Sequence, residues 1–180
     1  EFGKSQDVLY RANITSFQNC DDHHLDNVAV YVKNVTYECD SNAFCDIVHG
    51  KLIVKTINPT REKELVLTVF RCPTEATGQC NENPVEHHIY LNCDKFINDD
   101  SGPWHMISKA MTGSKCGEET GEFDFVSMKM HFDYLLNYIK DDYVADENMR
   151  KYRLKMEFHN KGKTAVRGCA SFDFNILPLK

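Results

Sequence analysis

Eight cysteines are spread through this chain of 180 residues, and their positions constrain the fold more than any other feature. Cys20 lies near the start of the patterned sequence, Cys169 lies in the last strand-like segment, and between them fall Cys39, Cys45, Cys72, Cys80, Cys93 and Cys116. An even and dense cysteine count is typical of proteins that fold in an oxidising compartment. The layout indicates one domain clasped end to end, with shorter crosslinks inside it. Eight cysteines allow on the order of a hundred pairings, so the sequence alone does not choose among them.

Two N-glycosylation sequons, Asn13-Ile14-Thr15 and Asn34-Val35-Thr36, favour the same compartment. We therefore expect a secreted, extracellular glycoprotein whose signal peptide has been removed, with the lysosomal or endosomal lumen as the alternative. No apolar run approaches the roughly 18 residues of a membrane span, so any membrane contact is expected to be peripheral. A net charge of -6 without a cluster of lysines and arginines argues against nucleic acid as a partner.

Alternation of apolar and polar residues predicts β-strands along most of the chain. The clearest run spans residues 123–134, and its expected apolar face consists of Val126, Met128, Met130, Phe132 and Tyr134. Residues 152–158 and 170–176 alternate in the same way. The polar segment 159–163 between them contains a glycine and predicts a hairpin.

Shorter runs in the first half complete the pattern, at residues 28–32, 51–57, 65–71 and 87–91. About seven or eight strands at this spacing predict an all-β fold, an immunoglobulin-like sandwich or cup of two antiparallel sheets. Two segments interrupt the strands. Residues 94–121 predict a long loop with a short helix, and residues 135–150 an acidic loop or helical turn. We expect a flexible N-terminal segment at 1–16 and a single domain at 17–180.

The order of cysteines and strands resembles the ML (lipid-recognition) superfamily, in particular its ganglioside-activator branch. The resemblance covers roughly residues 17–178. It lies in the opening, two cysteine pairs and the closing hairpin: Phe17-Gln18-Asn19-Cys20-Asp21, Cys72 with Cys80, Cys93 with Cys116, Tyr152-Arg153-Leu154, Lys161-Gly162-Lys163 and Arg167-Gly168-Cys169-Ala170.

The resemblance implies the disulfides Cys20–Cys169, Cys72–Cys80 and Cys93–Cys116, and it leaves Cys39 and Cys45 to pair with each other. That last pair departs from the activator, whose extra bridge lies within the long loop. The departure favours a sister branch, such as the secreted arthropod proteins of this superfamily that are linked to chemosensation. Members of the superfamily generally keep a hollow between their sheets that accepts acyl chains.

The apolar strand faces are the candidate lining of such a hollow. They are rich in methionine and aromatic side chains, which suit a site of irregular shape. The candidates are Val54, Leu67, Val69, Ile89, Leu91, Met128, Met130, Phe132, Leu154, Met156, Phe172 and Phe174, with Trp104 at the mouth. Alternation by itself favours an ordinary filled core, and the resemblance favours the hollow. Trp104 could equally insert at a membrane interface or cover the core as a lid.

No motif for catalysis or metal binding stands out, so we expect neither an enzyme nor a cofactor. The neighbouring pairs His23-His24 and His87-His88 would point to opposite faces of an extended chain, which disfavours chelation. The sequence thus predicts a secreted protein that binds a fatty acid, phospholipid or glycolipid and presents it to an enzyme, receptor or membrane. The alternative is a secreted signalling or chemosensory-associated protein with a filled core that acts through its outer surface.

Overall fold

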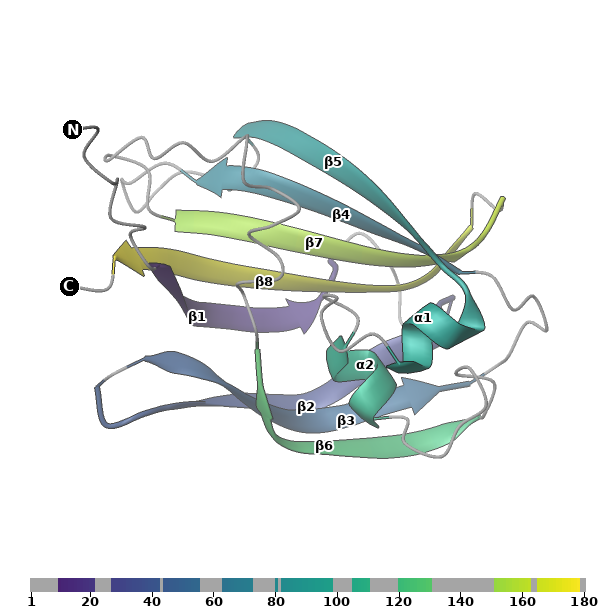
Figure 1. Ribbon diagram of the computed structural model, residues 1–180, viewed down its shortest axis with the longest axis horizontal. Coiled ribbons are helices and arrows are strands. Elements are labelled where there is room, and N and C mark those ends of the chain that lie inside the picture. The colour runs from purple at the N-terminus through teal and green to yellow at the C-terminus, as the bar shows by residue number, and fades with distance from the viewer. Residues whose placement is uncertain are drawn as a thin grey trace, which may run out of the picture.

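Two antiparallel sheets and two short helices form the described part of the chain in the computed structural model (Figure 1). The structure describes residues 10–21, 27–42, 44–55, 63–72, 80, 82–98, 105–110, 120–130, 151–162 and 165–178. Eight strands lie in these ranges, so the predicted all-β sandwich of two antiparallel sheets is confirmed.

The larger sheet has the strand order β1-β8-β7-β4-β5. Its strands are β1 (Tyr10–Asn19), β8 (Val166–Pro178), β7 (Lys151–Asn160), β4 (Lys63–Cys72) and β5 (Glu82–Leu91). The smaller sheet has the order β2-β3-β6, with β2 (Val30–Cys39), β3 (Cys45–Val54) and β6 (Gly121–Lys129). The predicted closing hairpin is the antiparallel pair β7 and β8. Helices α1 (Cys93–Asn98) and α2 (His105–Ala110) lie in the segment predicted as a long loop with a short helix.

Residues 10–16, which were expected to be flexible, form most of β1. This strand pairs with β8 along its whole length, and Ile14 is buried opposite Phe174. Ile14 and Phe17 of β1 are buried in the apolar cluster between the sheets, so β1 is part of the sandwich. Residues 1–9 lie outside the described part.

Strand β6 departs from its predicted alternation because it contains a β-bulge. Val48 pairs with Met128 and Gly50 pairs with Phe125, so one residue of β3 lies opposite both Val126 and Ser127. Because of the extra residue, the side chains before the bulge alternate out of phase with those after it. Val126 is therefore 72% exposed, not on the apolar face as predicted, while Phe125 is buried.

Because Gly50 has no side chain, the ring of Phe125 fits against its backbone in the core. A Cβ atom at Gly50 would lie 2.6 Å from Cζ of Phe125. The bulge and the glycine together bend the smaller sheet over the interior of the sandwich.

The predicted disulfides are present wherever both of their cysteines are described. Cys20–Cys169, Cys39–Cys45 and Cys72–Cys80 are bridged. Cys93 is also disulfide-bonded, and its predicted partner Cys116 lies outside the described residues.

The two sheets meet along one side, which we call the closed edge, where β1 and β8 lie against β2 (Figure 1). Asn19 joins the sheets there: its Nδ2 donates to the carbonyl of Val32 at 2.8 Å and its Oδ1 accepts from the Val32 amide at 2.9 Å. The amide of Ala29 donates to the carbonyl of Arg167 at 2.8 Å. The Asn19 side chain thus connects β1 to the backbone of β2, and the residue before β2 is bonded to the backbone of β8, so the closed edge is fixed in register as well as in distance.

Two further features of the closed edge are a disulfide within the larger sheet and a close approach of β8 to β2. The Cys20–Cys169 bridge spans a sequence separation of 149 residues with a Cα–Cα distance of 5.4 Å. Gly168 lies so close to β2 that a Cβ atom there would be 2.5 Å from the Val30 carbonyl oxygen. On the chain-entropy model, the long loop that the Cys20–Cys169 bridge closes stabilises the fold by about 5 kcal/mol.

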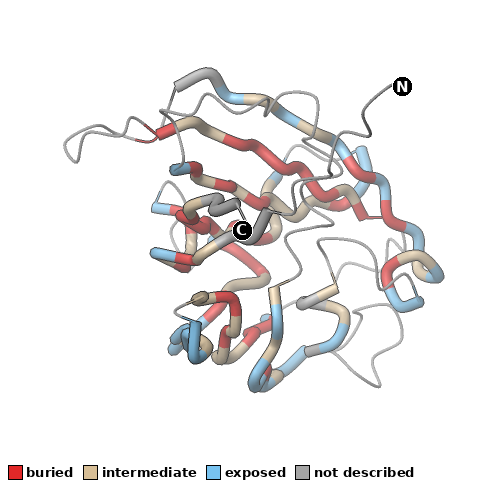
Figure 2. The backbone as a smooth tube through the Cα atoms, turned by 60° about the vertical axis from the view of Figure 1, so that its left-hand side comes forward, coloured by how far each residue is buried: buried red, intermediate tan, exposed pale blue. Residues whose placement is uncertain are grey.

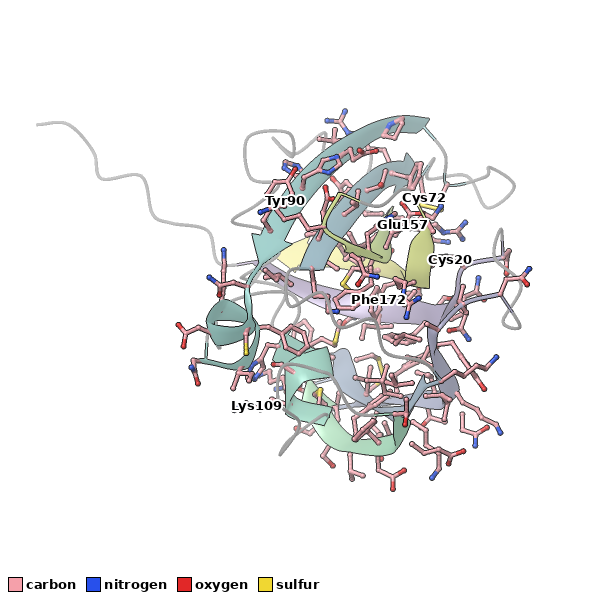
Figure 3. All side chains as sticks on the ribbon, turned by 90° about the vertical axis from the view of Figure 1, so that its right-hand side faces the viewer. Cys20, Cys72, Tyr90, Lys109, Glu157 and Phe172 are labelled. Carbon is pink, nitrogen blue, oxygen red and sulfur yellow. A yellow bond between two sulfur atoms is a disulfide. The ribbon has the colours of Figure 1, made fainter. Side chains whose placement is uncertain are left out.

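On the opposite side, which we call the helix edge, α1 and α2 lie between the sheets. Helix α1 contacts β5 and α2, and α2 contacts β6, so the two short helices connect the outermost strands of the two sheets. In Figure 3 Lys109 marks α2 on the left, and Cys20 marks the closed edge on the right. The backbones of β4, β5 and β7 lie farther from the smaller sheet than those of β1 and β8 do.

Asn19→Ala should destabilise the protein by about 2–3 kcal/mol, because two hydrogen bonds are lost and the buried amide and carbonyl of Val32 lose their partners. Urea unfolding without reductant measures the change in the free energy of unfolding. The control is Gln18→Ala, an exposed neighbour on the same strand, which should change stability by less than about 0.5 kcal/mol. Equal effects of the two substitutions would contradict the assignment of the closed edge.

Candidate functional site

The interior between the sheets is one continuous apolar cluster. Its buried members come from all eight of the described strands and from α1: Ile14, Phe17, Val32, Val48, Leu52, Val54, Leu65, Leu67, Val69, Ile89, Leu91, Phe96, Phe125, Tyr152, Leu154, Met156, Phe172 and Phe174. In Figure 2 long runs of buried residues follow the strands of the larger sheet, while exposed positions are frequent in the smaller one. The larger sheet thus supplies most of the apolar wall.

Aromatic rings mark both ends and the middle of this interior. Phe17 and Phe172 pack edge to face with centroids 4.1 Å apart, and Figure 3 shows Phe172 between the two layers. Tyr152 stacks on Phe174 near the start of β7. At the other end of β7 the rings of Phe158 and Phe96 lie 6.4 Å apart, which ties α1 to the larger sheet.

The predicted lining residues fall into three groups. Nine are buried members of the cluster: Val54, Leu67, Val69, Ile89, Leu91, Leu154, Met156, Phe172 and Phe174. Met128 and Met130 are partly buried and pack against it. Trp104 and Phe132 lie outside the described residues.

Sequence reasoning missed other members of the cluster for identifiable reasons. Phe125 is out of phase with the predicted apolar face of Val126, Met128 and Met130 because of the bulge in β6, so it was not among the candidates. Val48 lies before residue 51, where its strand was predicted to start. Strand β3 in fact begins at Cys45, and buried and half-buried positions alternate over its first four residues. Ile14 lies in the segment that was expected to be flexible, and a bulge between Ile14 and Ser16 places it three residues from Phe17, the next buried residue, so no period of two marks this strand.

A polar pair lies at the α1 end of the same apolar wall. Lys63 pairs with Asn160 in the register of β4 and β7, and its Nζ donates to Oδ1 of Asn160 at 3.3 Å. Lys63 is 7% exposed and Asn160 is 3% exposed. Because Leu65, Leu67 and Val69 follow Lys63 at steps of two, all four side chains lie on the inner face of β4.

The outer face of the larger sheet carries charged side chains. Arg153 donates two hydrogen bonds to the carboxylate of Asp173, at 2.6 and 2.9 Å, and this contact raises the pKa of Arg153. The ring nitrogens of His88 lie 2.6 Å from Glu64 and 2.5 Å from Glu86. Hydrogen bonds to these carboxylates raise the pKa of His88, and the bond to Glu64 has the largest effect.

The two glycosylation sequons differ in accessibility. Asn34 is exposed and has a positive φ of 53° within a bulge of β2, and Thr36 of the same sequon is also exposed. Asn13 is half-buried, and its Oδ1 accepts a hydrogen bond from the amide of Cys45 at 3.0 Å. Asn34 is therefore the better placed acceptor.

No cluster of three or more potential metal ligands occurs among the described residues. Neither α1 nor α2, the helices in the described part, has the length and apolar character of a membrane span. No family model matches the chain, and no curated protein sequence matches it significantly.

His88 should make the protein more stable in acid than at neutral pH. The pKa of His88 is higher in the folded protein than in the unfolded chain, where it is about 6.5. Its contribution to stability is therefore complete at pH values below the unfolded pKa and is lost as the pH rises through the folded pKa. The contribution should be below about 1 kcal/mol, because His88 is largely exposed and water screens the pair. His88 contacts Glu64 on β4 and Glu86 on β5 itself, and Glu64 in turn pairs with His159 in the register of β4 and β7.

Urea unfolding of wild type and His88→Gln at pH 5 and pH 8 measures this effect. The wild type should exceed the variant in stability at pH 5, and the gap should shrink at pH 8. As a control, the substitutions Glu64→Gln and Glu86→Gln together should remove most of the pH dependence of the gap. A gap of the same size at both pH values would contradict the prediction.

Proposed function

We propose that this protein is a secreted carrier that holds a lipid or similar apolar ligand between its two sheets. The observation that carries the proposal is the asymmetry of the sandwich. The sheets are bonded together at the closed edge, while α1 and α2 lie between the outermost strands at the helix edge. Apolar side chains of both sheets face the region between these two edges.

The mechanism is capture by burial. An acyl chain that leaves water gains about 0.8 kcal/mol per methylene group, part of which offsets the loss of freedom on binding. Met128, Met130 and Met156 contribute flexible side chains that can repack around chains of different shape. The complex would be soluble and could deliver its lipid to an enzyme, a receptor or a membrane, so the role is binding and not catalysis.

Membership of the ML superfamily is part of this proposal. Its support is the resemblance in cysteine order and closing hairpin, together with the Cys20–Cys169 and Cys72–Cys80 bridges that the resemblance implied. The Cys39–Cys45 bridge favours a branch other than the ganglioside activator. Passage through an oxidising secretory compartment is supported by the three bridges and by the exposed Asn34 sequon.

The second candidate is a secreted interaction module that acts through its outer surface. The charged outer face of the larger sheet favours it, because the Arg153–Asp173 pair and the His88 cluster form an ordered polar surface. A module of this kind needs no ligand between its sheets. Ligand binding therefore separates the two candidates.

A fluorescent fatty-acyl probe should bind the delipidated protein, and Met128→Trp should weaken the binding by about tenfold. The larger ring would fill part of the interior from the smaller sheet, since Met128 is partly buried against the apolar cluster. The control is Lys129→Trp, the exposed neighbour on the same strand, which should leave the affinity within about twofold. Probe titrations by fluorescence measure both affinities.

Thermal unfolding of both variants verifies that they are folded before the comparison. If the probe binds neither wild type nor Lys129→Trp, the carrier proposal fails and the interaction module is favoured. Equal weakening by both substitutions would place the probe elsewhere on the protein.

A further inference from the structure

The Cys39–Cys45 bridge differs in its access to solvent from the other bridges that have both cysteines described. It closes the turn between β2 and β3, which Figure 1 shows at the end of the sandwich opposite α1. Cys39 is exposed and Cys45 is half-buried. The cysteines of the other two bridges are only 1% to 8% exposed: Cys20, Cys169, Cys72 and Cys80. Because exchange requires a thiolate to reach a sulfur atom of the bridge, the folded protein presents Cys39–Cys45 to such a thiolate and shields the other two.

The turn between β2 and β3 is also held by hydrogen bonds that do not involve the bridge. Pairing of β2 with β3 continues up to Glu38 and Ile47, next to the turn. Within the turn, the amide of Asp40 donates to the carbonyl of Phe44 at 2.8 Å. Oδ1 of Asp40 accepts from the amides of Asn42 at 2.9 Å and Phe44 at 3.0 Å. These bonds hold the two ends of the turn together, so the hairpin should keep its shape when the S–S bond is broken.

Cys45 is fixed to the larger sheet independently of Cys39. The amide of Cys45 donates to Oδ1 of Asn13 on β1 at 3.0 Å. The Cα atoms of Cys39 and Cys45 lie 3.8 Å apart across the hairpin. A hairpin that keeps its shape would therefore hold the two thiols next to each other, which favours re-formation of the bridge after reduction.

The bridge also closes a short loop. The sequence separation of Cys39 and Cys45 is 6 residues, against 149 residues for Cys20 and Cys169. A short loop constrains the unfolded chain less than a long one does, so its reduction removes less stability from the fold. Exposure, the bonded turn and the short loop together favour reversible opening of this bridge in the folded protein.

We propose that the Cys39–Cys45 bridge is a site of thiol–disulfide exchange that reacts with a low-molecular-weight thiol of the glutathione class while the sandwich stays folded. The thiolate attacks Sγ of Cys39 and forms a mixed disulfide there. The bond to Cys45 breaks, and its electron pair leaves with Sγ of Cys45, which takes a proton from water. This chemistry takes place at the turn, so it does not depend on a ligand between the sheets.

The mixed disulfide on Cys39 has two fates. The thiolate of Cys45 attacks Sγ of Cys39, restores the bridge and expels the small thiol. Alternatively, a second small thiolate attacks the small-molecule sulfur, which releases a small-molecule disulfide and leaves thiols on Cys39 and Cys45. Two small thiols are then oxidised for each protein bridge that is reduced.

Partial reduction of the oxidised full chain by reduced glutathione, without denaturant, tests the proposal. Free thiols are alkylated at intervals and assigned by peptide mass spectrometry. Cys39 and Cys45 should be alkylated at least about tenfold faster than Cys72 and Cys80. The Cys72–Cys80 bridge is the matched control, because its sequence separation of 8 is close to 6 but its cysteines are buried. Far-UV circular dichroism of the same samples should stay unchanged.

Two single-thiol variants identify the sulfur that is attacked. With glutathione disulfide, Cys45→Ser should form a mixed disulfide on Cys39 about fivefold faster than Cys39→Ser forms one on Cys45, because Cys39 is the more exposed. Equal rates would overturn the assignment of Cys39 as the attacked residue.

The wild-type comparison decides the main proposal even where a variant fails to fold. Reduction of Cys72–Cys80 as fast as Cys39–Cys45 would overturn it, because the two bridges would then open together by unfolding. Loss of the strand signal as Cys39–Cys45 is reduced, or no reduction of this bridge before the chain unfolds, would overturn it as well.

Discussion

The bonds between β1, β8 and β2 at the closed edge are the constraint on which the rest of the structure depends. Asn19 binds the backbone of Val32 with both ends of its carboxamide, and Gly168 allows the strands to approach without a side chain between them. The Cys20–Cys169 bridge lies at the same place and ties the first strand to the last. The hydrogen bonds of Asn19 and Ala29 join the two sheets, and the disulfide fixes β1 to β8 within the larger sheet, so the closed edge does not rely on apolar packing alone.

That separation of roles gives the sandwich a physical basis for ligand binding. In a sandwich whose sheets are held together only by core packing, opening the core removes the contacts that stabilise the fold. Here the cohesion is concentrated at one edge, and the short helices α1 and α2 lie between the sheets at the other. The apolar cluster lies between these two edges, with the polar pair Lys63 and Asn160 at its α1 end.

Alternation was sufficient to predict the sandwich, the closing hairpin and nine of the buried lining residues, because burial on one face of a strand leaves a period of two. It failed at Val126 and Phe125, where a bulge inserts one residue and reverses the facing. It also could not identify the Lys63–Asn160 pair, since a lysine before an apolar run looks like an exposed strand end until the register is known. Asn19 gave no signal of its own, because its partner is the backbone of a strand in the other sheet.

Mass spectrometry of the native ligand tests the central claim most directly. The protein would be secreted from a eukaryotic host, purified without detergent and extracted with organic solvent, alongside an unrelated secreted protein as the control. The account predicts an acyl lipid in close to equimolar amount, enriched over the control and reloaded after delipidation. Absence of any enriched apolar molecule, together with failure of the delipidated protein to take up lipid from vesicles, would contradict it.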